Sequence, residues 1–269
     1  MSKLTEGINS GLSNAEYHAE REHLSSSNLK MLLDSPAQFY KEKILGERSN
    51  VTSAAMELGT FVHSLILEPE TVPNDFAVYT GWRKQGAEFE AFKEQHKGKI
   101  ILSQPQDHTG RRLAQSTKAC APALSLLTGG LPELSLATTL LDVPVKMRAD
   151  YINADRGYIV DVKTTRYPSG VDTFRRVVRE LGYELSAALY CDIAYRIYGK
   201  VFDFYWLVIS KSDVETQVYR ASTHTLSEGS ALVTKALIAY KKCKEAGVWP
   251  ETLDGIPKNA KELFEILEI

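Results

Sequence analysis

The amino-acid sequence predicts an α+β fold, with a central mixed sheet that is flanked by helices and preceded by a mainly helical N-terminal half. From residue 133 onward, short β-rich runs and helical patterns follow one another in the order βββαββα. Before residue 130, apolar side chains recur at helical spacing instead. Because no internal repeat or low-complexity stretch divides the chain, we expect one domain over residues 1–269, with a mainly helical part at 1–130 and the sheet and last helix at 131–269.

Three helical segments are predicted in the N-terminal half. The first covers residues 25–44, begins with three serines that can cap a helix, and is interrupted by Pro36. The second covers residues 54–67 and stops before Pro69. The third covers residues 109–127 and ends at a Gly-Gly turn.

The C-terminal half is predicted to supply the strands of the sheet. Asn153 and Gly157 are typical of a hairpin turn, and Gly199 is a typical residue for the end of a helix. The expected strands cover residues 133–139, 143–152, 157–162, 201–210 and 214–220, and the expected helices cover residues 182–198 and the region around 232–240.

Composition excludes several classes of protein. The chain of 269 residues has 43% hydrophobic and 25% charged residues, which is ordinary for a globular protein, and no apolar run approaches the ~20 residues that span a bilayer. Three widely spaced cysteines form no CxxC unit, which argues against a zinc ribbon or a four-cysteine iron–sulfur cluster. Free thiols and the lack of a secretory pattern in residues 1–11 predict a cytoplasmic protein without a membrane partner. Since the net charge is −2, any nucleic-acid binding would require a local basic surface.

Two carboxylates and a lysine form the strongest chemical signal. Asp161 and Lys163 are two residues apart on an expected strand, so their side chains should project from the same face. A hairpin would bring Asp150 from the preceding strand beside Asp161. Such carboxylates suit a hard cation such as Mg²⁺, which can acidify a bound water and neutralise a leaving oxygen. Lys163 could then position or deprotonate the water, or balance the charge of the transition state.

The alternative for this motif is a pair of solvated carboxylates and a lysine in an ordinary hairpin. Asp161, however, follows Tyr158, Ile159 and Val160 and precedes another valine. A charged side chain within so apolar a strand is unfavourable unless it is paired or coordinates a metal. We therefore prefer the metal site.

A local basic segment follows the motif. Five cations and one anion, Asp172, lie within residues 163–179. We expect this segment to bind the DNA backbone, although a plain solvated helix face would show the same charges. The arginines concerned are Arg166, Arg175, Arg176 and Arg179.

Four segments of the sequence together resemble a known family. The stretch MRADYINADRGYIVDVKTT is similar to the core of the PD-(D/E)XK nucleases, and specifically to the exodeoxyribonuclease VIII (RecE-like) and phage recombination exonuclease group. LSSSNLKMLLDSPAQFY, ELGTFVHSLILEPE and GYELSAALYCDIAY extend this resemblance from Leu24 to Tyr195 in the order found in the family. The resemblance implies a restriction-endonuclease-like core.

The resemblance also implies a function. It predicts a Mg²⁺-dependent exodeoxyribonuclease, with Mn²⁺ as an alternative ion, that digests one strand of linear double-stranded DNA from the 5′ end and leaves 3′ single-stranded tails. It further predicts a ring-shaped homo-oligomer, a trimer or tetramer, that binds DNA ends and acts with a single-strand annealing protein in recombination. The setting would be the cytoplasm of a bacterial or phage-infected cell.

Several metal-binding and catalytic residues come from the resemblance. A lone histidine among apolar residues is more often a packed core residue, but the family places a metal ligand at the position of His63. Glu133, otherwise a solvated residue at a strand end, matches an acidic residue of the family. Val162 is expected beside Asp150 and Asp161 in the metal site.

Further residues are expected to contact DNA. Ser25 and Ser27 would bind a 5′-phosphate, whereas simple helix capping is the commoner role of such serines. Tyr183 and Tyr190 come from the expected helix after Lys163. This sequence departs from the family in that helix, because Ser186 stands where a glutamine is usual, and Tyr183 or Glu184 could take its place.

Other functions remain open at this point. An endonuclease or a single-strand-specific nuclease could use the same core, and a catalytically inactive DNA-binding protein could keep the fold. A hydrolase of small phosphorylated substrates is disfavoured by the lack of a Gly-rich phosphate loop and by the arginines that follow Lys163.

Overall fold

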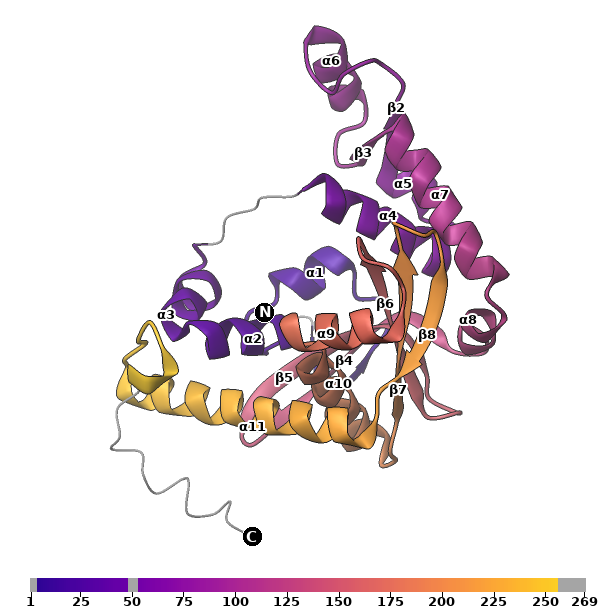
Figure 1. The fold of residues 1–269 in the computed structure, drawn as a ribbon. Helices are drawn as coiled ribbons and strands as arrows, with labels where there is room; N and C mark the ends of the chain where they lie inside the picture. Colours follow the sequence, from indigo (N-terminus) through magenta and orange to yellow (C-terminus); the bar gives the residue numbers. More distant parts are fainter. Residues whose placement is uncertain (1–3, 48–52, 256–269) are drawn as a thin grey trace.

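The computed structural model describes residues 4–47 and 53–255, and at its centre is a six-stranded mixed sheet in the order β1-β4-β5-β6-β7-β8 (Figure 1). Neighbouring strands are antiparallel except β6 and β7, which are parallel. The predicted fold class, a mixed sheet flanked by helices, is therefore confirmed. The strands are β1 (Gly7–Asn9), β4 (Leu131–Leu140), β5 (Val143–Asn153), β6 (Tyr158–Thr165), β7 (Asp203–Ser210) and β8 (Thr216–Arg220).

Turn chemistry and strand length fix the centre of this sheet. Leu141 and Asp142 both have positive φ, 46° and 60°, so they form a two-residue turn whose twist matches the long β4–β5 hairpin. In contrast, β5 and β6 pair over only three residue pairs and then separate. Parallel pairing of β6 with β7 requires a long connection, which two helices provide.

Helices cover both faces of the sheet and bury two apolar clusters. One cluster joins β4–β7 to α2 (Ser26–Asp34), α9 (Val171–Glu180), α10 (Tyr183–Tyr198) and α11 (Thr223–Ala246). The other joins the opposite face to α4 (Ala54–Leu67), α7 (Gln104–Ala119) and α8 (Ala121–Leu126). Alternation along the strands divides the residues, so that Ile159 belongs to the first cluster and Val160 to the second. Within the described ranges, no helix has the length and hydrophobicity needed to cross a lipid bilayer.

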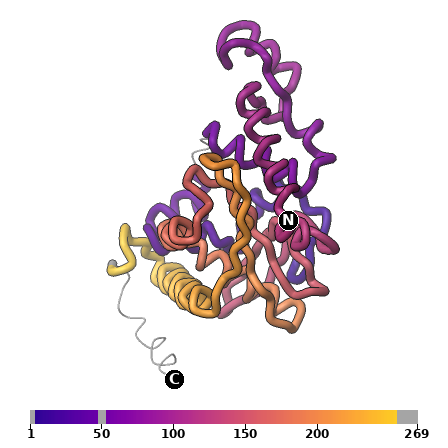
Figure 2. Tube along the Cα trace, turned by 45° about the vertical axis from the view of Figure 1, so that its right-hand side comes forward, coloured from indigo at the N-terminus to yellow at the C-terminus, as the bar shows by residue number. Residues whose placement is uncertain are grey.

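The remaining elements lie at the edge of this core. A small parallel sheet and a helix project from it in both views (Figures 1 and 2). These are β2 (Phe76–Tyr79), α6 (Ala87–Gln95) and β3 (Ile100–Ser103), preceded by α5 (Val72–Asp75). The other short elements are α1 (Asn14–Ala19), α3 (Pro36–Phe39), the π-helical turn η1 (Tyr40–Leu45) and the 3₁₀ turn η2 (Leu253–Gly255).

The predicted elements agree with the structure in most places and differ in several. The helix expected over residues 54–67 has those bounds in α4. The helix expected over residues 109–127 begins five residues earlier, at Gln104, and is broken at Cys120 into α7 and α8. The predicted order βββαββα omits α9, because residues 171–180 were interpreted only as part of a basic segment. The projecting elements, β1 and α1 were also not predicted, and residues 1–3, 48–52 and 256–269 of the expected domain lie outside the described residues.

Candidate metal centre

The candidate site lies where β5 and β6 separate. The last residue pair between these strands is Tyr151 with Val160, and Asp150 is the next residue toward the opening. Beyond the last pair, the Asp150 carboxylate replaces the missing strand contact, because its Oδ2 accepts a hydrogen bond of 2.6 Å from the Val162 backbone N–H. The short pairing thus leaves room for side chains at this end of the sheet.

Glu133 faces Asp150 across the β4–β5 hairpin. Pro132 pairs with Tyr151 and Leu134 with Ala149, so Glu133 and Asp150 are directly opposite each other. Glu133 has a φ of 50°, which is unfavourable for a residue other than glycine, and strained residues of this kind occur at functional sites as well as in turns. Two carboxylates at directly opposed positions also repel each other. Backbone strain and charge repulsion therefore both occur at Glu133 of β4.

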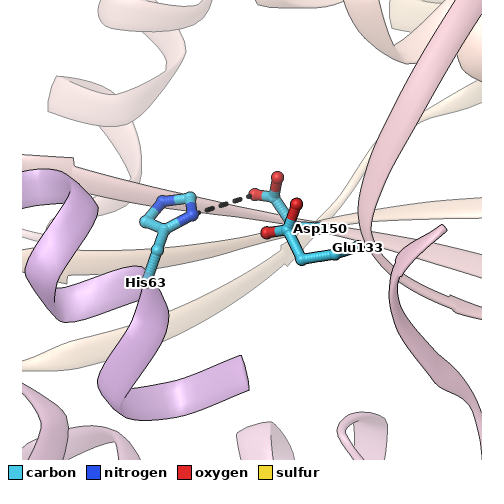
Figure 3. Close-up of side chains that lie close together, drawn as sticks. All are labelled: His63, Glu133 and Asp150. Atoms are coloured by element: carbon cyan, nitrogen blue, oxygen red, sulfur yellow. Dashed lines mark ion pairs between the residues drawn. The ribbon is translucent and has the colours of Figure 1, made fainter. Parts of the chain in front are cut away.

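His63 reaches the two carboxylates from α4, on the other side of the opening (Figure 3). The helix can approach β6 closely at Gly59, where a Cβ would lie only 3.3 Å from Thr164 Oγ1. His63 Nδ1 lies 3.7 Å from Asp150 Oδ2. One ligand atom from each of His63, Glu133 and Asp150 lies within 4.8 Å of the others, so the three side chains could hold one metal ion between them.

Asp161 and Lys163 lie on β6 next to this cluster and form an ion pair with each other. Their side chains share a face of the strand, and Lys163 Nζ is 2.6 Å from Asp161 Oδ2. Asp161 is only 6% exposed, so its charge depends on a nearby partner. The structure places Asp161 beside the three-residue cluster of His63, Glu133 and Asp150 and not within it.

Burial and mutual repulsion shift the pKa values of the carboxyl groups. The pKa of Asp150 is raised by burial and then by the negative charge of Asp161. The pKa of Glu133 is raised by burial and by Asp150, although Arg148 partly offsets this. Arg148 Nε donates a hydrogen bond of 2.7 Å to Glu133 Oε2. A bound cation would relieve the repulsion that remains.

Burial and neighbouring charges also shift the pKa values of the basic groups. Burial and the neighbouring Lys163 lower the pKa of His63, which favours the neutral imidazole that can bind a metal. Burial alone would lower the pKa of Lys163, but Asp161 and Asp150 outweigh it and raise that pKa. Of the roles expected for Lys163, balancing negative charge therefore agrees better with the structure than removing a proton from the water.

The donor set fits a divalent cation. Two carboxylates and one imidazole suit Mg²⁺ or, with the nitrogen ligand, Mn²⁺. A cavity of about 660 Å³ lies over the cluster and is lined by all three side chains, by Arg148 and by Tyr190. Substrate could therefore reach the metal ligands. The backbone N–H of Val162 contacts Asp150, and a direct metal contact of Val162 stays a prediction.

The tyrosines expected to contact DNA both lie on the site side of α10. Tyr183 contacts Lys163 through a cation–π interaction, with Lys163 Nζ 5.1 Å from the centre of the Tyr183 ring. Ser186, at the position where the family usually has glutamine, is buried. Glu184 instead lines a cavity formed with residues of α9 and α11. Of the two suggested replacements for glutamine, the structure brings only Tyr183 next to Lys163.

The two serines expected to bind phosphate line a second cavity, of about 400 Å³. Ser25 caps α2, since its hydroxyl accepts a hydrogen bond from the Asn28 backbone N–H, and Ser27 Oγ lies 2.9 Å from Ser25 Oγ. Arg21, which the sequence analysis did not identify, lines the same cavity, and the other charged residues of its lining are Glu20, Glu42, Lys43 and Lys146. Tyr17 and the neighbouring His18 line both this cavity and the one over the metal ligands, so the two cavities adjoin at α1.

The four arginines expected to bind DNA are exposed around the end of β6 and on α9. Two of them already form ion pairs on their own helix: Arg175 with Asp172, and Arg176 with Glu180. Arg166 donates a hydrogen bond of 2.8 Å to the Tyr167 hydroxyl. Solvated charges and a DNA-binding face are both compatible with these contacts, so the DNA role of Arg166, Arg175, Arg176 and Arg179 stays a prediction.

Sequence reasoning missed two cations that approach the predicted site. Arg148 precedes Asp150 by two residues on the same strand, so the alternation that linked Asp161 to Lys163 could have identified it. Lys30 comes from α2, 133 positions before Lys163 in the sequence, and lies 5.3 Å from the centre of the Tyr183 ring. Its only local signal is the helical spacing from Ser27.

Comparisons with known proteins agree with this fold. A family model described as "PDDEXK-like domain of unknown function (DUF3799)" matches residues 25–256. The crystal structure of a "Putative exonuclease" from Eubacterium rectale matches with a TM-score of 0.68 and 17% identity, over 91% of this chain and 90% of that chain. Lower TM-scores are found for the structure of SSO0001 (0.38, 10% identity, 83% and 81% coverage) and for a phage related exonuclease from Haemophilus somnus 129PT (0.30, 11% identity, 81% and 93% coverage). A search of curated proteins found no match.

Proposed function

Because the chain belongs to the PDDEXK-like family DUF3799, we propose that it is a metal-dependent deoxyribonuclease that hydrolyses phosphodiester bonds at the site between β5 and β6. One observation supports this proposal above all. Glu133, Asp150 and His63 come from three separate elements and bring ligand atoms within 4.8 Å of one another, beside the Asp161–Lys163 pair. A purely structural cluster would not require a strained backbone and opposed carboxylates at the same position.

The residues of the site have distinct roles in this reaction. His63, Glu133 and Asp150 would hold Mg²⁺ or Mn²⁺, with Asp161 and Val162 completing the site. When bound, the ion supplies an acidified water and neutralises charge on the phosphate oxygens.

Lys163 keeps a positive charge next to the reacting phosphate, because Asp161 and Asp150 raise its pKa. The ring of Tyr183 and the Asp161 carboxylate fix the position of the Lys163 ammonium, which therefore needs little rearrangement when substrate binds. Arg148 orients Glu133 through a hydrogen bond of 2.7 Å.

We further propose that the enzyme is an exonuclease that begins at a 5′ end. The cavity with Ser25, Ser27 and Arg21 offers hydroxyls, a helix N-terminus and a guanidinium, which together suit a terminal phosphate. It adjoins the metal cavity at Tyr17 and His18, so a strand whose 5′-phosphate lies in one cavity can present a nearby phosphodiester in the other. Digestion would leave a 3′ single-stranded tail.

The remaining parts of the proposal depend on the sequence resemblance. We propose a ring-shaped trimer or tetramer that encloses the duplex and hands its product to a single-strand annealing protein for recombination in the cytoplasm. Arg166, Arg175, Arg176 and Arg179 would contact the DNA backbone near the entrance to the site.

The central experiment compares DNA substrates with and without Mg²⁺. Linear duplex with a 5′-phosphate should be degraded, linear duplex with a 5′-hydroxyl should be degraded more slowly, and covalently closed circular DNA should stay intact. Cleavage of the circle would instead support an endonuclease, and cleavage restricted to single strands would support a single-strand-specific nuclease.

A variant tests whether the predicted site performs the cleavage. Asp161→Ala should abolish Mg²⁺-dependent cleavage because Lys163 loses its ion pair and the site loses a carboxylate. Asp203→Ala is the matched control, since it removes a carboxylate from an exposed ion pair with Arg220 and should keep full activity. Full activity of Asp161→Ala would place the chemistry elsewhere. A folded wild-type protein that binds DNA without cutting it would support an inactive DNA-binding protein.

A further inference from the structure

Lys30 is held in a defined position beside the catalytic lysine. Its aliphatic chain packs on Gly182 between α9 and α10, where the Cδ and Cε atoms of Lys30 lie 3.5 Å from the position of an added Cβ. Its Nζ lies 5.3 Å from the centre of the Tyr183 ring, and Lys163 Nζ lies 5.1 Å from the same ring centre. Two ammonium groups therefore share one aromatic ring.

These two ammonium groups differ in their partners. Lys163 has an ion pair with Asp161, whereas Lys30 forms no ion pair or hydrogen bond with any residue in the described part of the chain. The carboxylates of Asp161, Glu184 and Asp34 act on Lys30 only from a distance. Burial and the charge of Lys163 accordingly lower the pKa of Lys30 to about 8.

A half-buried cation next to another cation is unfavourable unless an anion binds to it. The position of Lys30 is nevertheless defined by contacts, because its stem packs on Gly182 and its ammonium lies over the Tyr183 ring. Lys30 also lies one helical turn after Ser27, which lines the second cavity. Lys30 therefore lies close both to Ser27, on its own helix, and to Lys163, which contacts the same Tyr183 ring.

We propose that Lys30 is a substrate-binding residue that contacts a non-bridging phosphate oxygen of the DNA backbone. This phosphate would be next to the reacting phosphate, whose charge Lys163 balances. This inference rests on the proposed nuclease function, and it adds a contact from α2, on the side of the opening away from α4. Each ammonium group contacts the Tyr183 ring, Lys30 Nζ at 5.3 Å and Lys163 Nζ at 5.1 Å from its centre, so the two could bind neighbouring phosphates.

The test measures DNA binding without cleavage. The affinity of the protein for a 5′-phosphorylated linear duplex is measured by fluorescence anisotropy in Ca²⁺, at several salt concentrations. Lys30→Met keeps the length of the stem and removes the charge, Lys30→Gln is a second neutral variant, and Lys30→Arg retains the charge. Lys235→Met, on the exposed face of α11, is the matched control.

Loss of one phosphate contact has a defined signature. Lys30→Met and Lys30→Gln should bind about tenfold more weakly, and the slope of log K against log salt concentration should become about 0.9 shallower. Lys30→Arg and Lys235→Met should keep the wild-type slope. If Lys30 only packs against Tyr183, Lys30→Met should bind like wild type with an unchanged slope.

The possible failures are distinguishable. If the wild-type protein binds and cuts DNA but the neutral Lys30 variants keep the wild-type salt dependence of binding, this inference is overturned and the nuclease function stays supported. A wild-type protein that neither binds nor cuts DNA would overturn both. Thermal melting identifies any variant that does not fold. The slope of log K against log salt concentration, measured for whichever of Lys30→Met and Lys30→Gln folds, then decides whether Lys30 contacts a phosphate.

Discussion

Replacing Lys146 by methionine should destabilise the protein strongly, because it breaks a buried ion pair that fixes α1. Lys146 Nζ lies 3.0 Å from Glu20 Oε2, and it also donates hydrogen bonds to the backbone carbonyls of Tyr17 (2.5 Å) and Glu20 (2.9 Å). Only 4% of the Lys146 side chain and 3% of the Glu20 side chain are exposed. Methionine would therefore leave the Glu20 carboxylate buried without its cation.

The magnitude follows from this burial. Removing one partner of a buried ion pair costs about 3–5 kcal/mol. In a protein of this size that loss lowers Tm by roughly 6–20 °C, at about 2–4 °C per kcal/mol. The Lys241–Asp142 pair is the matched control: its atoms are also 3.0 Å apart, but its side chains are 35% and 90% exposed. Lys241→Met should cost no more than about 1 kcal/mol.

Calorimetric or fluorescence-monitored melting of both variants measures the difference. If Lys146→Met melted as close to wild type as Lys241→Met does, the buried pair would not stabilise α1 and the reasoning would be refuted. Glu20→Gln combined with Lys146→Met should be less destabilised than the two single variants together, since neither charge is then left without a partner.

The same pair gives the stability a defined pH dependence. Burial alone would raise the pKa of Glu20, but hydrogen bonds from Lys146 and His23 outweigh it, so the pKa is lowered. A carboxylate with a lowered folded-state pKa stabilises the protein above its unfolded-state pKa of about 4.3, and this contribution is lost as the pH falls through the folded-state value. The stability difference between wild type and Glu20→Gln should therefore be constant above about pH 5 and shrink below about pH 4.

Two further predictions concern the metal ligands and the helix packing. Mn²⁺ at about one hundred times its Kd should stabilise the wild-type protein by about 2.7 kcal/mol and raise its Tm by roughly 5–10 °C in differential scanning fluorimetry. The same Mn²⁺ concentration should raise the Tm of His63→Ala far less. An equal rise in Tm would mean that His63 is not a ligand. Gly229→Ala should lower Tm markedly in the same assay, because its Cβ would overlap the Glu184 backbone carbonyl of α10, whereas Gly170→Ala meets no atom within 4 Å and should melt like wild type. Equal melting of these two glycine variants would contradict the close approach of α10 and α11.

Local sequence patterns were sufficient to predict the elements that carry the central motif. Alternation along a strand has a period of two, so it places Asp161 and Lys163 on one face without knowledge of any other part of the chain. Hairpin signals between Asn153 and Gly157 similarly predict that Asp150 returns beside Asp161. These are short-range constraints, which backbone geometry imposes on neighbouring residues.

Residues far from the motif in sequence were harder to place. His63 entered the predicted site only through resemblance, since one histidine in an apolar helix has no distinguishing local pattern. Lys30 was missed because nothing near it in the sequence marks it as close to Lys163. The segment that forms α9 was recognised for its charge but not as a helix.

The sequence by itself determined strands β4 to β8, most helices and the shared face of Asp161 and Lys163, because each depends on the periodicity of adjacent residues. Only the tertiary structure decided how the site is assembled. The separation of β5 from β6, the opposition of Glu133 to Asp150 and the approach of α4 and α2 from either side depend on strand register and helix packing between distant segments. Those contacts arise from burial of two apolar clusters on the two faces of the sheet, which no local pattern encodes.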